Sequence, residues 1–338
     1  MVRRRGRGPV WIGLFLVAAL AIGVIVRVSL ADTGASGPTG VVLTSPPSRA
    51  GYFHTLPVGA WSRLPGDQAC ADRVHQSAWE PRPDNYGPNH QMPDAAAVHR
   101  AFAARPVASG KSYRPVWDRW LLQRVDGQYT GTTDEIIQWA ACKWGVSDNL
   151  LRAMAVQEST WNSHLVYPSG RCVPERGCGD LVQTPSQATR VFCDGIGAHG
   201  HDYQVDYAPG RCPETFGMMG VKSWQAPQWG PMPGNQNGTF PFNRDSTAFS
   251  ADYLAAQLRG CYEGWETWLG HTSAGAYRPG RLWGCVGAWY AGAWLTPAAR
   301  GYVDGVRSKL AARVWLDPRW DKEKTACSPQ FGCPVPNS

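Results

Sequence analysis

Charged residues are scarce in this sequence, and acidic residues are absent from its beginning. Only 17% of the 338 residues are charged, and the first 31 residues contain five arginines but no aspartate or glutamate. These arginines account for most of the formal net charge of +7, because the rest of the chain has 28 basic and 26 acidic residues, a net charge of +2. A chain this close to neutral beyond its first residues does not indicate a nucleic-acid partner.

The first 31 residues are typical of an export segment. Four arginines precede an apolar run from Val10 to Val26, and Ser29 and Ala31 are small residues at the positions that a signal peptidase reads. The run also reaches the lower length limit for a membrane span. A cleaved signal peptide and an uncleaved single-span anchor therefore both remain open. Either one predicts an extracytoplasmic protein, secreted or anchored to the outer face of the cytoplasmic membrane.

Cysteine pairs separated by two residues, the spacing of zinc-binding knuckles, are missing. The ten cysteines are Cys70, Cys142, Cys172, Cys178, Cys193, Cys212, Cys261, Cys285, Cys327 and Cys333. An even number in an exported chain favours disulfides, with Cys172–Cys178 and Cys327–Cys333 as plausible local pairs. The segment His199–Asp202 matches no metal site and is interpreted as a solvated loop. We expect neither a metal nor an organic cofactor.

Internal repeats and strong strand patterns are also absent, while 43% of the residues are hydrophobic, enough for a folded core. Residues 32–50 are rich in glycine, serine, threonine and proline and predict a flexible spacer. Residues 51–130 show little periodicity apart from a helix over 93–104, and we expect this irregular region to pack on the helical region beyond residue 130. Residues 163–214 form a long insert rich in glycine, proline and cysteine, and residues 321–338 a tail with two cysteines.

Helix signals become strong from Thr132 onward. Thr132 and Glu135 fit a capping box for a helix that stops at Gly145, and Ser147 can cap a second helix over 148–161. Further helices are predicted over 248–259 and 283–292. The last begins at Thr296, which precedes a proline at the first helical position and an apolar stripe. The sequence therefore predicts a mainly α fold.

Glu158 is the acidic residue with the most unusual position. It continues the helical face that carries Leu151, Met154 and Ala155. Burying a carboxylate among apolar side chains is costly, and the resulting desolvation favours the protonated acid, which can donate its proton to a leaving group. The alternative is a helix-end carboxylate that reaches solvent or pairs with an arginine.

Three motifs around this helix carry a family resemblance. The stretch Glu158–Asn162 resembles the Glu-Ser-x-x-Asn signature of the soluble lytic transglycosylases, relatives of goose-type lysozyme. Residues 215–221 (TFGMMGV) are similar to that family's Ser-x-Gly-Leu-Met-Gln-Val segment, and residues 288–292 (AWYAG) to its Ala-Tyr-Asn-Ala-Gly segment. Two positions differ: Gly220 stands where the family has glutamine, and Tyr290 where it has asparagine.

The resemblance spans roughly residues 133–315 and implies a lysozyme-like transglycosylase domain over 131–320, with the long disulfide-containing insert inside it. It implies that Glu158 is the sole catalytic acid and base. The implied substrate-binding residues are Ser159, Asn162, Gly217, Met218, Met219, Trp289 and Tyr290. The implied substrate is the glycan strand of peptidoglycan, cleaved between N-acetylmuramic acid and N-acetylglucosamine with formation of a 1,6-anhydro product.

Two other functions remain open at this point. A muramidase would need a second carboxylate to activate water, at roughly 6.5–9.5 Å from the first if the enzyme inverts. The insert offers five candidates for it, which are Asp180, Asp194, Asp202, Asp206 and Glu214. An inactive cell-wall-binding module of the same fold is the second alternative, because a fold alone does not establish activity. Trp161, Trp224, Trp229 and Trp289 lie in or near the motifs and could stack on sugars or pack in the core.

Overall fold

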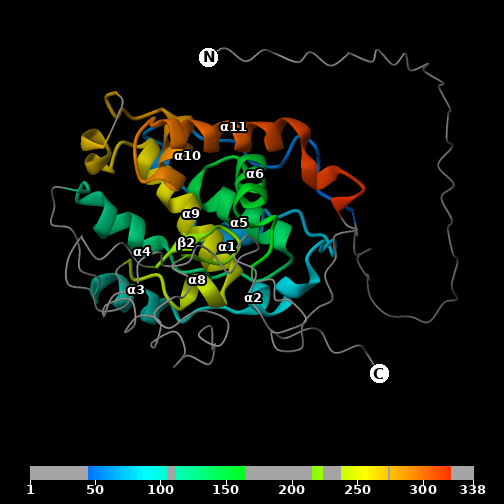
Figure 1. Ribbon diagram of the computed structural model, residues 1–338. Coiled ribbons are helices and arrows are strands. Elements are labelled where there is room, and N and C mark those ends of the chain that lie inside the picture. The colour runs from blue at the N-terminus through cyan, green and yellow to red at the C-terminus, as the bar shows by residue number, and fades with distance from the viewer. Residues whose placement is uncertain (1–44, 105–111, 164–214, 224–236, 273–274, 321–338) are drawn as a thin grey trace, which may run out of the picture. The chain divides into compact units, whose positions relative to one another are not determined.

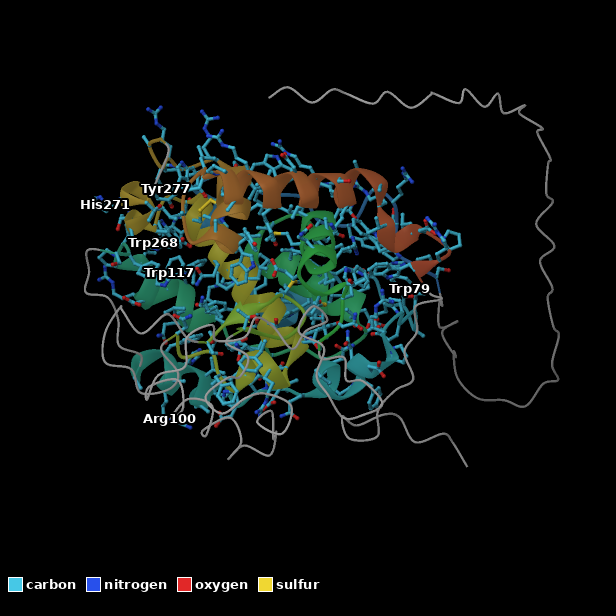
Figure 2. All side chains as sticks on the ribbon, in the orientation of Figure 1. Trp79, Arg100, Trp117, Trp268, His271 and Tyr277 are labelled. Carbon is cyan, nitrogen blue, oxygen red and sulfur yellow. A yellow bond between two sulfur atoms is a disulfide. The ribbon has the colours of Figure 1, made fainter. Side chains whose placement is uncertain are left out.

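The computed structural model describes residues 45–104, 112–163, 215–223, 237–272 and 275–320. All of them belong to one compact unit, which begins at Val42. This part of the chain is mainly helical, as the sequence predicts, and its side chains fill the space between the helices (Figures 1 and 2). None of its helices has the length and apolarity that a membrane span requires. The predicted leader and tail, residues 32–44 of the predicted spacer, the two predicted local cysteine pairs and the segment His199–Asp202 lie outside the described residues. The last six residues of the predicted spacer, 45–50, belong to the described unit, where the carbonyl of Arg49 accepts a hydrogen bond from the side chain of Asn149.

The region 51–130 contains more helix than the sequence predicts. Its elements are short: η1 (Ala60–Arg63), α1 (Asp67–Ala71), η2 (Pro83–Asn85), α2 (Tyr86–His90), α3 (Ala95–Ala104), the π-helical turn η3 (Trp117–Leu121) and α4 (Leu122–Arg124). The sequence predicts only α3 among them. Helices of three to five residues are too short to show a periodic pattern, and they depend on contacts with the rest of the protein.

The second half of the described chain carries the longest helices, together with a short hairpin and several short helical turns. They are α5 (Thr133–Trp144), α6 (Asp148–Ser159), β1 (Thr215–Phe216), β2 (Val221–Lys222), α8 (Phe242–Asp245), α9 (Thr247–Tyr262), η6 (Thr267–His271), α10 (Leu282–Ala291), α11 (Pro297–Ala312) and η7 (Val314–Leu316). The two strands pair antiparallel, Thr215 with Lys222 and Phe216 with Val221. The sequence does not predict this hairpin, because two residues per strand leave no alternation to detect.

Four predicted helix-end residues are confirmed, whereas α6 ends at Ser159, two residues earlier than predicted, because Thr160 adopts the left-handed conformation. The side chain of Thr132 accepts from the Glu135 N–H while Glu135 reaches back to the Thr132 N–H, which completes the capping box of α5. Gly145 ends α5 in the left-handed conformation at φ 57°. Ser147 caps α6, and Thr296 caps α11 ahead of its proline.

The core is centred on α5, which packs between α6 and α9. Helix α9 packs on α5 and α10, and α6 packs against both α5 and α11. Two disulfides join these elements: Cys70 of α1 is bonded to Cys142 of α5, and Cys261 of α9 to Cys285 of α10. The first disulfide attaches α1, in the region 51–130, to α5. Every cysteine in the described residues is paired.

A buried arginine fixes α6 against α5. The guanidinium of Arg152 is fully buried, and its Nε and Nη2 donate to the two carboxylate oxygens of Asp134 at 2.7 and 3.1 Å. Its Nη1 donates to Asp148 at 2.7 Å and to the side-chain oxygen of Asn149 at 3.0 Å. Paired in this way, the charge is tolerated in the core. Removal of the arginine would leave two carboxylates buried without a cation.

We therefore expect Arg152→Met to lower the free energy of unfolding by about 3–5 kcal/mol, the cost of breaking a buried ion pair from one side. Denaturant unfolding with the disulfides intact measures this change. Arg100→Gln is the matched control, because it removes an exposed pair with Asp94 and leaves the unfolding midpoint almost unchanged. Equal stability of the two variants would contradict the role assigned to Arg152.

Candidate active site

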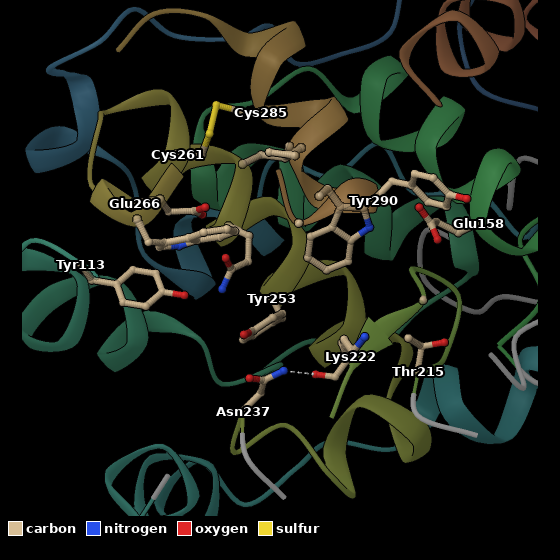
Figure 3. A pocket seen from close by; sticks show the side chains of 17 residues that line it. Tyr113, Glu158, Thr215, Lys222, Asn237, Tyr253, Cys261, Glu266, Cys285 and Tyr290 are labelled. Carbon is tan, nitrogen blue, oxygen red and sulfur yellow. Dashed lines mark hydrogen bonds between the residues drawn. A yellow bond between two sulfur atoms is a disulfide. The ribbon is translucent and has the colours of Figure 1, made fainter. Parts of the chain in front are cut away.

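A pocket of about 200 Å³ contains the carboxyl that the sequence singled out (Figure 3). Its walls come from α6, the β1–β2 hairpin, α9, η6 and α10, together with Tyr113 and Asn237. Both Glu158 and Glu266 line it, on opposite sides of the view in Figure 3. The pocket is lined by Tyr113, Glu158, Thr215, Gly220, Lys222, Asn237, Tyr253, Gln257, Leu258, Cys261, Glu266, Trp268, Cys285, Ala288, Trp289, Tyr290 and Gly292.

Glu158 lies in the last turn of α6 and is half-buried. The hydroxyl of Tyr302, from α11, donates a hydrogen bond to its Oε1. Burial, the neighbouring Glu158 carboxylate and Tyr290 raise the pKa of Tyr302 well above its usual value, so this hydroxyl keeps its proton. Because Oε1 is an acceptor for Tyr302, the proton of the acid form of Glu158 belongs on Oε2.

The other oxygen of Glu158 faces Gly220, and any other residue at this position would force the Glu158 carboxyl to move. Gly220 has a φ of +60°, and a Cβ built on it would lie 2.6 Å from Oε2 of Glu158. Any larger side chain at this position would therefore displace the carboxyl, in addition to adopting a strained backbone. The glycine at the family's glutamine position thus removes a polar side chain and also makes room for the acid.

Ser159 connects the helix end to the hairpin. It is buried, and its hydroxyl donates to the Met218 carbonyl at 2.8 Å. The hairpin turn is also held from α9, since the Met219 N–H donates to Ser250 at 3.3 Å. Asn162 is buried as well, and its amide donates to the Ser159 carbonyl at 2.9 Å, where it stabilises the end of α6. Ser159 and Asn162 thus stabilise the end of α6, the helix that carries Glu158.

The expected substrate-binding residues divide into two groups. Met218 and Met219 have no exposed surface and lie in the core, and Gly217 lies at the turn with φ +74°, packed against Asn243. None of these three lines the pocket, whereas Trp289 and Tyr290 do. The structure therefore assigns the turn residues to the scaffold and the two aromatic residues of α10 to the pocket wall.

Tyr290 is the most exposed large aromatic side chain on this wall, at 60% relative exposure. Its ring stacks on Tyr302, with 4.9 Å between centroids and 7° between planes. An exposed ring beside a carboxyl suits stacking on a sugar face. Trp161, considered for the same role, is fully buried and packs on Trp79. Trp224 and Trp229 lie outside the described residues.

Two functional candidates were missed by sequence reasoning. Tyr302 precedes Val303 on the buried face of α11, and a hydroxyl on an apolar stripe is the signal that could have identified it. Glu266 lies between Trp265 and Trp268, and a lone acid among tryptophans is a comparable signal. Neither residue belongs to a motif, and each reaches the pocket only through the packing of the fold.

Glu266 differs from Glu158 in its surroundings. Only 5% of it is exposed, and burial raises the pKa of its carboxyl to about 8. In the part of the chain that the structure describes, its backbone N–H donates to the Tyr277 hydroxyl at 3.3 Å, whereas its carboxyl oxygens have no hydrogen bond. Glu266 is therefore an uncharged acid at neutral pH. The five acidic residues of the insert, expected as possible second carboxylates, lie outside the described residues.

Among the described residues, no cluster of histidine, cysteine, aspartate and glutamate could hold a metal ion. Comparison of the chain with family models, with curated proteins and with solved structures gave no match. The assignment of a function therefore depends on the pocket and its side chains.

The raised pKa of Glu266 predicts a pH-dependent stability. Its carboxyl ionises from about pH 4.5 in the unfolded chain but only near pH 8 in the folded protein. Between these values the folded state holds one more proton, so stability falls as pH rises, with a slope approaching about 1.4 kcal/mol per pH unit. We expect Glu266→Gln to flatten this part of the profile, measured by thermal unfolding between pH 4.5 and 8.5. Parallel profiles of the two proteins would contradict burial of the acid.

Proposed function

We propose that the protein is a peptidoglycan lytic transglycosylase with Glu158 as its single general acid and base. The observation that carries the proposal is a half-buried carboxyl on the wall of a pocket, oriented through one oxygen by Tyr302 and given room at the other by Gly220. The three sequence motifs supply the class of substrate, the glycan strands of the cell wall. The exposed ring of Tyr290 offers a surface for a sugar beside the acid.

In the proposed reaction, Oε2 of Glu158 gives its proton to the glycosidic oxygen between N-acetylmuramic acid and N-acetylglucosamine. The bond from C1 of the muramic acid to that oxygen breaks, and the N-acetylglucosamine leaves with a new hydroxyl. The 6-hydroxyl of the same muramic acid then attacks C1, and Glu158 takes up the proton that this hydroxyl releases. The products are a 1,6-anhydro sugar and a chain that ends in N-acetylglucosamine, and Glu158 is again protonated. The reaction consumes no water and needs neither a metal nor a second carboxylate.

A hydrolytic reaction would need a base that is ionised when Glu158 is protonated. The second carboxyl that lines the pocket in the described residues is that of Glu266. Burial raises its pKa to about 8, so it is protonated at neutral pH and a poor base for water. This observation argues against Glu266 as the second carboxylate of a muramidase.

The proposed location is outside the cytoplasm, where peptidoglycan lies. The two disulfides of the described residues are compatible with an oxidising compartment. We propose that the N-terminal arginines and apolar run direct export, with the chain either secreted or held at the outer face of the cytoplasmic membrane.

Product analysis tests the reaction. Mass spectrometry of purified peptidoglycan treated with the full chain should show muropeptides with 1,6-anhydro ends. Glu158→Gln should reduce their release by roughly 100-fold or more, because the acid and the base are lost together. Products with reducing ends would instead identify a hydrolase. Peptidoglycan turnover that Glu158→Gln leaves unchanged would favour a wall-binding module of this fold.

The hydrogen bond from Tyr302 has its own test. Tyr302→Phe keeps the ring and its stacking on Tyr290 but removes the donor to Glu158. We expect kcat to fall roughly 10- to 150-fold, the equivalent of a hydrogen bond to a charged group, while KM changes little. The pH profile of kcat should shift as well, because the carboxyl loses a neighbouring donor. A raised KM with unchanged kcat would instead assign Tyr302 to substrate binding.

A further inference from the structure

The proposed reaction makes no use of Glu266, although this carboxyl lines the same pocket as Glu158. Glu266 precedes η6 in the connection between α9 and α10. Burying a carboxyl without a hydrogen bond is costly, and most buried polar groups in proteins have partners. The position of Glu266 on a pocket wall suggests that the partner of its carboxyl is a bound ligand.

A second polar group beside Glu266 also lacks a partner. Trp268 lines the pocket, and its indole Nε1–H is buried without an acceptor in the described part of the chain. Trp268 thus offers a buried N–H donor without an acceptor, and Glu266, two residues before it in the sequence, offers a largely buried carboxyl on the wall of the same pocket. The backbone there is fixed, since the Trp268 N–H donates to the Ser112 carbonyl at 3.1 Å.

The surrounding surface specifies what kind of group would fit. Tyr113 and Tyr253 line the same pocket and add aromatic surface to that of Trp268 (Figure 3). Because no cation pairs with Glu266 among the described residues, and burial keeps it protonated at neutral pH, an anionic group would find no attraction there. The two donors on this wall are the O–H of Glu266 and the indole N–H of Trp268. A neutral ligand group would match them if it had a carbonyl oxygen to accept these hydrogen bonds and a methyl group to pack on the aromatic rings.

We propose that Glu266 and the indole N–H of Trp268 recognise the acetamido group of one N-acetylated sugar, at the end of the pocket away from Glu158. The acetamido carbonyl accepts from these donors, and its methyl group packs on the aromatic wall. The choice of an N-acetylated sugar as the ligand rests on the proposed function. It makes Glu266 a specificity residue that acts as a neutral acid, not as a second catalytic carboxylate.

The experiment measures discrimination between two oligosaccharides that differ only at the 2-position. Chitotetraose carries acetamido groups, whereas cellotetraose carries hydroxyls. Calorimetric titration of the full chain in a Glu158→Gln background gives both affinities without turnover. The background protein should prefer chitotetraose, and Glu266→Leu should reduce that preference by at least about tenfold, since the site loses a buried hydrogen bond.

Glu266→Gln distinguishes a neutral acid from a carboxylate. Glutamine is uncharged and keeps a donor and an acceptor, so the preference should stay within about threefold of the background value. Trp268→Phe keeps an aromatic ring, removes the N–H and should also reduce the preference. It provides the same test if Glu266→Leu fails to fold. Asp304→Asn, the control, removes an exposed carboxyl on α11 and should leave the preference for chitotetraose unchanged.

Several outcomes overturn the inference. They are a background protein without preference for chitotetraose, an unchanged preference in both Glu266→Leu and Trp268→Phe, or a loss in Glu266→Gln as large as in Glu266→Leu. The result is separable from the proposed reaction. Anhydro products from the wild type with an unchanged preference in the variants defeat only this inference. Reducing-end products with a lost preference defeat only the proposed chemistry.

Discussion

The position of α6 depends on one buried guanidinium. Arg152 bridges Asp134 on α5 and Asp148 at the start of its own helix, so α6 cannot rotate or slide without leaving charges unpaired in the core. The carbonyl of Arg152 also accepts from the indole of Trp161 at 3.0 Å, which fixes the chain just beyond the helix end. Glu158 lies between these two attachments. Its location is therefore set by the backbone, and its side chain needs only a correct rotamer.

The other groups around the acid are held by similarly distant contacts. Tyr302 comes from α11, 144 residues further along the chain, and Gly220 from a hairpin that α6 and α9 hold through Ser159 and Ser250. No single element among the described residues contains the site. Rigid supports on several sides keep a reacting group in the geometry that catalysis needs, and the residues that provide them contribute without touching a substrate.

The parts of this arrangement that are local could be predicted. Thr132, Ser147 and Thr296 cap helices through bonds to a backbone N–H three residues further along, and the place of Glu158 on a helix face follows from helical periodicity. The short helices before Thr132 and the hairpin could not, because disulfides and buried polar contacts with distant residues stabilise them. Motif similarity suggests that Met218 lines the cleft, but the turn directs its side chain into the core. That direction depends on left-handed glycines, which a motif does not describe.

The two carboxyls of the pocket have the same chemistry and different surroundings. Glu158 is half-buried, and one of its oxygens accepts a hydrogen bond from Tyr302, whose hydroxyl stays protonated. In the proposed reaction it serves in turn as acid and as base. Glu266 is almost wholly enclosed and has no donor among the described residues to stabilise a negative charge, so its neutral form persists to about pH 8. A carboxyl that stays protonated at neutral pH is a poor general base, but it can donate a hydrogen bond to a ligand. The different burial and hydrogen bonding of the two carboxyls are the basis for the roles proposed for them, catalysis for Glu158 and sugar recognition for Glu266.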